Sequence, residues 1–471
     1  MKSKSLIDYC NKLILAPMVR GSLLPTRLLA LRYGADLVYT DEIIDLSMLQ
    51  TKRRENSILG TVDFTNEDSG CLLFRTSPAE KQKLIFQIGT SNPQRAIKVA
   101  RMVQNDVSGI DINMGCPKPY STSLGIGAAL LSNVNVAKSI VQGLVENIDL
   151  PVTCKIRVSD DIEHTINLVK DFETLGVSAV TVHGRTRHQR SSEPVNKDAI
   201  RKIAESVRIP IIANGGSLDI KDFSEIIKFK EDCGTTSVMV ARAALQNLSV
   251  FRKEGTIDVQ DLITEYLKLC VDFDHPCSNV EYCLRRMLLP LGKVEKSPIG
   301  NDFMAAKSLE AFCDIWKLGD YCREKQSQYK SKGLQDAPPR GIKTPLELIL
   351  AREEKFSKTN IIHERMEYRR KVFDVNSIPK SILNGYCGRN GIPKPTYETT
   401  RINSQFYSIV TVRDKQYTSV LLQKDERDAQ QAAALVCCYH LGLYDEDFLV
   451  SIGCLYKRYF VLFFLDLIGN N

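Results

Sequence analysis

Short apolar runs rich in valine and isoleucine recur along the first half of the chain, and each run ends in glycine or polar residues. Apolar runs of this length that are bounded by turn residues are typical of buried strands. The pattern therefore predicts eight strands, at residues 12–19, 36–43, 84–90, 109–116, 152–158, 179–185, 210–216 and 237–244.

Amphipathic segments with apolar residues at i, i+3 and i+4 lie between these strands and predict helices, at residues 92–106, 135–148, 162–176 and 195–207. Eight buried strands, each followed by a helix, within about 250 residues indicate an α/β fold of the (β/α)8 TIM-barrel class. A doubly wound open sheet alternates strands and helices in the same way. The barrel is favoured because polar residues gather at the carboxyl end of nearly every strand, and in a barrel these ends converge on one mouth.

The pattern changes after residue 250, where helical periodicity takes over. A proline- and glycine-rich stretch at 332–345 then predicts an exposed linker, and the charged segment at 346–373 is expected to be partly helical. Residues after 377 follow the order helix, three strands, helix, which indicates an α+β (αβββα) domain. The predicted parts are a catalytic barrel domain, a helical domain, a linker with a basic connector, the αβββα domain and a tail to which we assign no function, at residues 8–249, 250–331, 332–376, 377–443 and 444–471.

Composition narrows the class of protein. A chain of 471 residues exceeds what one core usually holds, and 43% hydrophobic with 25% charged residues is typical of a globular protein. Neither a secretory signal nor a transmembrane segment is expected, because the apolar run in the tail has about half of the ~20 residues that a spanning helix needs. The 14 cysteines are scattered and form no C-x-x-C, which favours a reducing, cytoplasmic or nuclear location. The six histidines show no metal-ligand spacing, so no metal site is expected.

The positive charge of the chain is concentrated in one region. The formal net charge is +7, and residues 338–415 hold 15 Lys or Arg against 8 Asp or Glu. This region alone therefore accounts for the whole basic excess, and the rest of the chain is neutral in sum.

The segment GIDINMGCPKPYS (109–121) places a cysteine between glycine and proline at the end of a predicted strand. Gly115 lets the backbone approach a ligand, and Pro117 takes the chain out of the strand, so Cys116 is expected at the barrel mouth. A free cysteine is also among the residues most often buried in a core. The segment by itself leaves both interpretations of Cys116 open.

The other strand ends supply an amide, a cation and an imidazole, which are Gln87, Lys155 and His183. The loops after strands 7 and 8 of a barrel are the usual phosphate-binding loops of this fold, and here they read ANGGS and ARAAL, with Arg242 in the second. A phosphate site with a cation beside a planar, electron-poor ring is what flavin mononucleotide (FMN) requires. Each residue also has a structural interpretation: Lys155 as a solvated charge, His183 as a core histidine and Asn214 as a turn former.

Seven motifs resemble those of the tRNA dihydrouridine synthases in order and spacing. They are LAPMV (15–19), FQIGT (86–90), DINMGCP (111–117), CKIR (154–157), TVHGRTR (181–187), ANGG (213–216) and MVARAAL (239–245), and the resemblance covers residues 8–331. The αβββα segment resembles a double-stranded RNA-binding domain. This combination is similar to the eukaryotic branch of the family that acts on uridine 20 of the tRNA D-loop.

The resemblance implies a role for each candidate residue. It implies FMN as cofactor, NADPH as hydride source and tRNA as partner, with no membrane contact, while the oligomeric state stays open and is compatible with a monomer. Cys116 becomes the general acid that protonates C5 of uracil while C6 receives a hydride. Asn113 is the candidate for the uracil edge and Arg185 or Arg187 for phosphate or base contacts. The residues implied for flavin binding are Pro17, Met18, Gln87, Lys155, His183, Asn214, Gly215, Gly216, Ala241 and Arg242.

The αβββα segment departs from the RNA-binding pattern at the start of its last helix. Paired lysines are usual there, whereas this chain has Glu426 and Arg427. Arg369, Arg370 and Lys371 are expected to compensate as RNA contacts, although a solvated basic face is the simpler interpretation. Two other functions remain: a flavin oxidoreductase acting on a free dihydropyrimidine- or dihydroorotate-like molecule, and a catalytically silent RNA-binding regulator.

Overall fold

The computed structural model describes residues 7–66, 70–122, 124–190, 192–217, 219–334, 352–353, 355–374, 377–402 and 405–455. The chain divides into two compact units, Met1–Gly341 and Ile342–Asn471.

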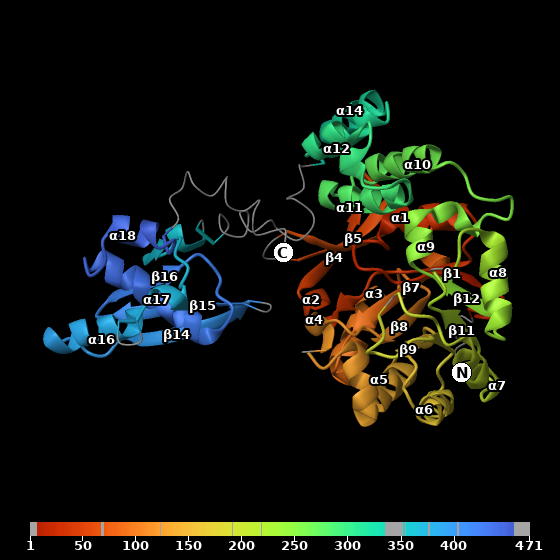
Figure 1. Cartoon of the computed structure of the whole chain (residues 1–471), viewed down its shortest axis with the longest axis horizontal. Coiled ribbons are helices and arrows are strands. Elements are labelled where there is room, and N and C mark those ends of the chain that lie inside the picture. Colours follow the sequence, from red (N-terminus) through yellow and green to blue (C-terminus); the bar gives the residue numbers. More distant parts are fainter. Residues whose placement is uncertain are drawn as a thin grey trace. The chain divides into compact units, whose positions relative to one another are not determined.

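Eight parallel strands close into a barrel in the first unit (Figure 1). They coincide with the eight predicted strands and are β1 (Leu13–Leu15), β2 (Leu37–Tyr39), β7 (Leu84–Gly89), β8 (Gly109–Met114), β9 (Val152–Arg157), β10 (Ala179–His183), β11 (Ile211–Asn214) and β12 (Ser237–Val240). Neighbours pair in the order β2-β1-β12-β11-β10-β9-β8-β7, and the pairing of β2 with β7 closes the ring. The TIM-barrel prediction is confirmed.

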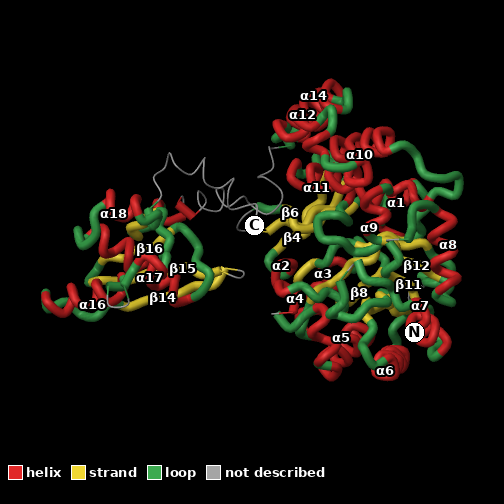
Figure 2. The backbone as a smooth tube through the Cα atoms, in the orientation of Figure 1, coloured by secondary structure: helices red, strands yellow, loops and turns green. Residues whose placement is uncertain are grey.

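Helices surround the strands (Figure 2). Four of them begin at a side-chain N-cap, because Asn92, Asp161, Asn196 and Asp222 each accept a hydrogen bond from a backbone N–H in the first turn. The helices of the barrel are α1 (Leu24–Arg32), α3 (Pro93–Val103), α4 (Pro119–Thr122), α5 (Val134–Asn147), α6 (Ile162–Thr174), α7 (Lys197–Glu205), α8 (Phe223–Asp232) and α9 (Arg242–Gln246), with 3-10 turns at Lys81–Lys83, Gly127–Ser132 and Leu248–Phe251.

The chain departs from the strand-helix repeat between β2 and β7. A two-residue strand, β3 (Ile43–Ile44), pairs with β7, and only the four-residue α2 (Asp45–Met48) follows it. A separate antiparallel sheet comes next, formed by β4 (Thr51–Asn56), β5 (Thr61–Asn66) and β6 (Leu72–Thr76). The expectation that each strand is followed directly by the next helix is wrong here. Phe64 and Phe74 of this sheet join the large apolar core on the outer face of the barrel strands, where Phe74 packs edge-on against Phe86.

Alternate residues along the strands belong to two apolar clusters. Ile14, Tyr39 and Met239 contribute to one cluster, whereas Leu15, Val38 and Val240, their neighbours along the chain, belong to the large core. Side chains on a strand point alternately to its two faces, so the first cluster fills the barrel and the second lies between strands and helices.

The helices after the barrel share its large apolar core. They are α10 (Val259–Asp272), α11 (Cys277–Leu288), α12 (Gly300–Ala305), α13 (Leu309–Ile315) and α14 (Gly319–Ser331), with 3-10 turns at Leu289–Leu291 and Val294–Lys296. Leu262, Leu284 and Phe312 are fully buried in the cluster that also contains the barrel strands. The predicted helices therefore form, and they lie within the first compact unit.

The second unit has the predicted order of helix, three antiparallel strands and helix. These are α16 (Pro379–Arg389), β14 (Thr396–Ile402), β15 (Gln405–Val412), β16 (Lys415–Ser419) and α17 (Glu426–His440). Two additions were not predicted. The connector supplies β13 (Ile361–Glu364), which pairs parallel with β16, and the tail supplies α18 (Glu446–Ser451), with Leu449 fully buried. A short 3-10 turn covers Arg370–Val372.

Candidate active site

The strand register places the predicted residues at one end of the barrel. Asn113 on β8 pairs with Lys155 on β9, and Lys155 pairs in turn with Thr181 on β10. Two pairs further along, His183 lies between Arg157 and Asn214. The carboxyl ends of β7 to β11 therefore bring an amide, a cation and an imidazole to neighbouring positions, as the sequence predicted.

The loop that carries Cys116 is held by the side chain of Asn113. Its Oδ1 accepts hydrogen bonds from the backbone N–H groups of Gly115 at 2.9 Å and Cys116 at 3.0 Å. Arg157 Nε donates to the carbonyl of Gly115 at 2.8 Å, and the carbonyl of Cys116 accepts from Ala128 N at 2.9 Å. The Cys116 side chain is half-buried at the barrel mouth and does not belong to the apolar core.

A buried carboxylate lies beneath this loop. Asp111 accepts hydrogen bonds from Gln87 Nε2 and from Thr153 Oγ1, both at 2.7 Å. The orientation of Gln87 is thereby fixed, and its Oε1 accepts from Asn113 Nδ2 at 3.4 Å. Burial raises the pKa of Asp111 to about 6, against the two hydrogen bonds and the nearby Lys155. Asp111 was not among the predicted site residues, although a single acidic residue inside an apolar strand is a visible signal in the sequence.

Positive charge surrounds the imidazole at the end of β10. Burial, together with Lys155, Arg157, Arg185 and Arg242, lowers the pKa of His183 to about 2, so the ring is neutral at physiological pH. The buried Nδ1 of His183 has no hydrogen-bond partner among the described residues. Burial and then Arg157 lower the pKa of Lys155 to about 8. A buried polar atom without a partner, next to four cations, fits a site for an anionic ligand.

The loops after β11 and β12 provide backbone for such a ligand. Gly215 has φ +119°, a conformation that side chains disfavour, and a Cβ there would lie 3.5 Å from both Arg185 Nη1 and His183 Cε1. Gly216 packs against the ring of Phe229, and Ala241 precedes the first turn of α9, with Arg242 exposed. The Asn214 amide donates to the Met239 carbonyl at 2.8 Å, so in this structure it joins β11 to β12.

The two arginines predicted for substrate contacts differ in exposure. The Arg185 side chain is buried, and it donates to the carbonyls of Glu193 at 2.6 Å and Gly215 at 2.9 Å. Arg187 is exposed, and it donates to Ser132 Oγ at 3.0 Å and to His188 at 2.9 Å. Arg185 therefore holds two loops of the barrel mouth together, whereas Arg187 lies at the surface.

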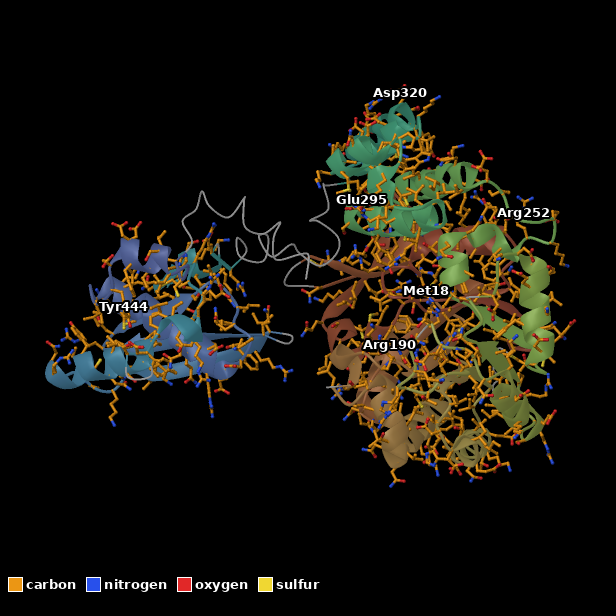
Figure 3. All side chains as sticks on the ribbon, viewed as in Figure 1. Met18, Arg190, Arg252, Glu295, Asp320 and Tyr444 are labelled. Carbon is orange, nitrogen blue, oxygen red and sulfur yellow. The ribbon has the colours of Figure 1, made fainter. Side chains whose placement is uncertain are left out.

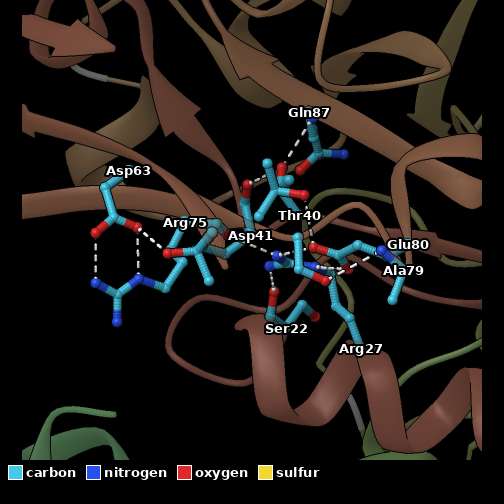
Figure 4. Close-up of polar contacts among 12 residues, drawn as sticks. Ser22, Arg27, Thr40, Asp41, Asp63, Arg75, Ala79, Glu80 and Gln87 are labelled. Carbon is cyan, nitrogen blue, oxygen red and sulfur yellow. Dashed lines mark hydrogen bonds and ion pairs between the residues drawn. The ribbon is translucent and has the colours of Figure 1, made fainter. Parts of the chain in front are cut away.

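The β1 end of the barrel presents Pro17 and Met18, both half-buried. Met18 is labelled in Figure 3. Met18 N donates to Ser22 Oγ at 2.9 Å, which shapes the turn before α1. Ser22 also links this turn to a buried network in which Arg27 donates to the Ser22 carbonyl and pairs with Glu80 (Figure 4). The predicted flavin-contacting turn is therefore anchored by buried charges.

The carboxyl end of β2 contributes two acidic side chains that the sequence analysis did not assign to the site. Burial raises the pKa of Asp41 to about 7, against the attraction of Arg27, and burial also raises the pKa of Glu42. Both residues lie near the end of the predicted strand at 36–43. The sequence does not show which side chains their carboxyl groups contact.

The predicted RNA-contacting residues lie in the second unit. Arg369 Nε pairs with Glu367 at 3.1 Å, and Arg370 begins the exposed 3-10 turn. The Lys371 side chain lies outside the described residues. Lys424 forms an ion pair with Asp428 at 3.2 Å across the first turn of α17.

The residues of the site lie within a segment that matches a known protein family. A family model described as Dihydrouridine synthase (Dus) matches residues 14–288, more than half of the chain. The chain belongs to the dihydrouridine synthase family. The matched residues include the barrel strands, apart from Leu13 at the start of β1, and the mouth residues described above.

Named proteins of the dihydrouridine synthase family are similar to this chain in sequence. The chain is 40% identical over 293 residues to "tRNA-dihydrouridine(20) synthase [NAD(P)+]" of Schizosaccharomyces pombe, a match that covers 60% of each chain. It is 37% identical over 301 residues to the protein of the same name from Saccharomyces cerevisiae, covering 60% of this chain and 78% of that one. A solved "tRNA-dihydrouridine(20) synthase dsRBD domain" is 34% identical, covering 18% of this chain and 92% of that chain, with a TM-score of 0.17.

No group of His, Cys, Asp or Glu side chains within the described ranges is arranged to hold a metal ion. In the same ranges, no helix has the length and apolar character that crossing a membrane would need.

Proposed function

We propose that this chain reduces uridine 20 of the tRNA D-loop to 5,6-dihydrouridine, with FMN as bound cofactor and NADPH as reductant. The observation that carries the proposal is the place of Cys116. Its loop is fixed by Asn113 at the mouth of a barrel whose neighbouring strand ends supply Lys155 and a neutral His183. Membership of the dihydrouridine synthase family and the names of the two yeast relatives support the same reaction.

The cation cluster supports an anionic cofactor. The phosphate of FMN would be bound by the backbone of Gly215, Gly216 and Ala241 and by the guanidinium of Arg242. Pro17, Met18, Gln87, Lys155 and His183 line the remainder of the mouth and would contact the ring system. When bound, FMN supplies the hydride that C6 of uracil accepts.

The residues of this chain perform the proton chemistry. Saturation of the C5–C6 bond needs a proton at C5, and Cys116 donates it from its thiol as the general acid. The hydrogen bonds of Asn113 to the Cys116 loop keep the thiol in place. Lys155 lies close enough to Cys116 to attract the thiolate that remains after proton transfer.

The second unit supports tRNA as the substrate. Double-stranded RNA is bound mainly through its shape, phosphates and 2′-hydroxyl groups, which suits a basic αβββα domain without base-specific pockets. Extruding a uridine into the barrel costs a few kcal/mol, so the remainder of the tRNA needs to be held. Arg369, Arg370 and Lys371 are the proposed phosphate contacts of this unit.

Activity on a defined transcript tests the function. The FMN-loaded protein, NADPH and an unmodified tRNA transcript are expected to yield one dihydrouridine at position 20, detected by mass spectrometry of nuclease fragments. A transcript with cytidine at position 20 is the matched control. Cys116→Ala should keep its flavin and the flavin's reduction by NADPH but form product about a hundredfold more slowly, as expected for a lost general acid. Reduction of free uracil or dihydroorotate-like molecules at the expense of tRNA would instead support the small-molecule oxidoreductase.

Removal of the second unit tests the partner. A chain that ends at Gly341, at the boundary of the first compact unit, should retain flavin reduction and lose most of its activity on tRNA. If the shortened chain modifies tRNA as well as the full chain does, the αβββα domain serves another partner.

A further inference from the structure

The carboxyl group of Glu42 lies against the loop that carries the catalytic thiol. Its Oε2 and Oε1 accept hydrogen bonds from Ser121 Oγ, at 3.1 and 3.4 Å. The carboxyl also lies close enough to the side chains of Cys116 and Asn113 for both to lower its pKa, against the effect of burial. Glu42 therefore contacts both the thiol proposed as the proton donor and the amide that holds its loop.

Close packing keeps the carboxyl in this position. Ser121 is fully buried, and a Cβ added at Gly89, the last residue of β7, would lie 2.7 Å from Glu42 Oε1. On the other side of the loop, a Cβ at Gly127 would lie 3.1 Å from the Cβ of Cys116 and 3.2 Å from the Cβ of Ser121. Two glycines thus leave just enough room for the carboxyl and the thiol to lie together.

Glu42 and Cys116 have neighbours of opposite charge. On the Glu42 side lies Asp41, whose carboxyl repels that of Glu42, and no cation is among the groups that lower the pKa of Glu42. On the Cys116 side lie Lys155 and Arg157, both close enough to interact with the thiol. Because burial raises the pKa of Glu42, its carboxyl holds a proton beside the thiolate once the thiol has reacted.

We propose that Glu42 is a positioning residue that returns a proton to Cys116 after each turnover. This inference rests on the proposed function. Cys116 loses its proton to C5 of uracil and becomes a thiolate. The O–H bond of the Glu42 carboxyl then breaks, an S–H bond forms, and a carboxylate remains, which takes up a proton from water at the barrel mouth. No electrons are transferred in this step.

The proton transfer from Glu42 to Cys116, here called the relay, is tested by measuring the first turnover separately from later ones. Glu42→Gln keeps the shape and a hydrogen bond to Ser121 but carries no exchangeable acid. The holoenzyme is reduced first and then mixed with tRNA, so that the thiol enters the first turnover already protonated. The first turnover should stay within about threefold of the wild-type rate, while the steady-state rate falls at least about tenfold, a smaller loss than the roughly hundredfold or more expected for the general acid itself. Glu42→Asp should partly restore the steady-state rate.

Asp41→Asn is the matched control, because it removes the neighbouring buried carboxyl without removing the contact with Cys116. Its ratio of first-turnover to steady-state rate should equal that of the wild type, whatever its effect on either rate. Equal slowing of both phases in Glu42→Gln would mean that Glu42 only supports the loop, and an unchanged steady-state rate would mean that water reprotonates Cys116 directly. Either result overturns the relay.

A chemical readout distinguishes failure of the relay from failure of the proposed function. Iodoacetamide alkylates the thiolate form of cysteine, and mass spectrometry reports the modification at Cys116 without any tRNA. Glu42→Gln should speed alkylation severalfold at pH 8, because an amide cannot pass a proton to the thiolate as the Glu42 carboxyl does, whereas Asp41→Asn should have a smaller effect. If Glu42→Gln and wild type are alkylated equally, the coupling of the two groups is disproved even where dihydrouridine formation proceeds.

Discussion

The side-chain oxygen of Asn113 accepts a hydrogen bond from the backbone N–H of Cys116 at 3.0 Å. Asn113 was predicted to contact the edge of uracil. The structure shows that its oxygen is used within the protein, to shape the loop of the proposed general acid. The uracil contact remains a prediction for its amide nitrogen, which donates weakly to Gln87 at 3.4 Å and lies near the Glu42 carboxyl.

Asn113→Ala should therefore slow dihydrouridine formation about tenfold to a hundredfold without releasing the flavin. Two backbone N–H groups lose their acceptor, and the loop of Cys116 loses its fixed geometry. Single-turnover kinetics and the flavin absorbance of the same sample measure the two effects. Loss of flavin in proportion to activity would show that Asn113 acts mainly through the cofactor.

His183 should stay neutral in the folded protein, since its pKa lies at about 2. The unfolded chain takes up this proton near pH 6.5, so stability rises with pH through this region and is lost as pH falls below about 6.5. At pH 5 the loss amounts to up to about 2 kcal/mol. Urea unfolding at pH 5 and pH 7 measures it, and Trp316, the only tryptophan, reports on the first unit alone. His183→Gln should be less sensitive to pH, and an equal pH dependence would contradict the shifted pKa.

Glu80→Gln should destabilise the first unit by about 3–5 kcal/mol, because it leaves a buried guanidinium without its counter-charge. Glu80 and Arg27 are both almost completely buried, with atoms 2.6 Å apart (Figure 4). The exposed pair of Arg32 and Glu265 is the control, and Glu265→Gln should change stability by less than about 1 kcal/mol. Trp316 fluorescence in urea measures both variants. Similar losses from the two substitutions would mean that burial does not set the strength of these pairs.

Glu426→Lys should tighten binding of tRNA severalfold, because an exposed acid is replaced by a cation where the resemblance to double-stranded RNA-binding domains predicts lysine. The change also removes an acidic residue from the first turn of α17, which should cost the domain about 0.3–1 kcal/mol. Binding titrations over a range of salt concentrations measure both affinity and slope, and the tighter variant should show the steeper slope. Arg427→Gln is the control, because it removes a positive charge from the same turn and should weaken binding of tRNA. Unchanged affinity in both variants would place the RNA elsewhere on the unit.

Local patterns were enough to predict the barrel and the αβββα domain. Buried strands and amphipathic helices are set by the spacing of apolar residues, which the sequence displays directly. The same pattern located Gln87, Lys155 and His183, since the polar ends of parallel strands meet at one mouth. The three-stranded sheet at 51–76 and the strand at 361–364 were not predicted, because short strands with exposed or half-buried residues carry a weak periodic signal.

The side-chain contacts within the site could not be predicted from the sequence, because they form only when the barrel closes. No sequence rule shows that Arg185 is used to hold backbone carbonyls or that Asp111 orients Gln87. Nor does one show that Glu42, which follows β2, lies near Cys116, more than 70 positions later in the chain. These relationships follow from strand register and loop packing, which join residues far apart in the chain. The sequence by itself determined which chemical groups stand at the barrel mouth. Only the tertiary structure decided which of them contact one another, because those distances are fixed when the ring of strands closes.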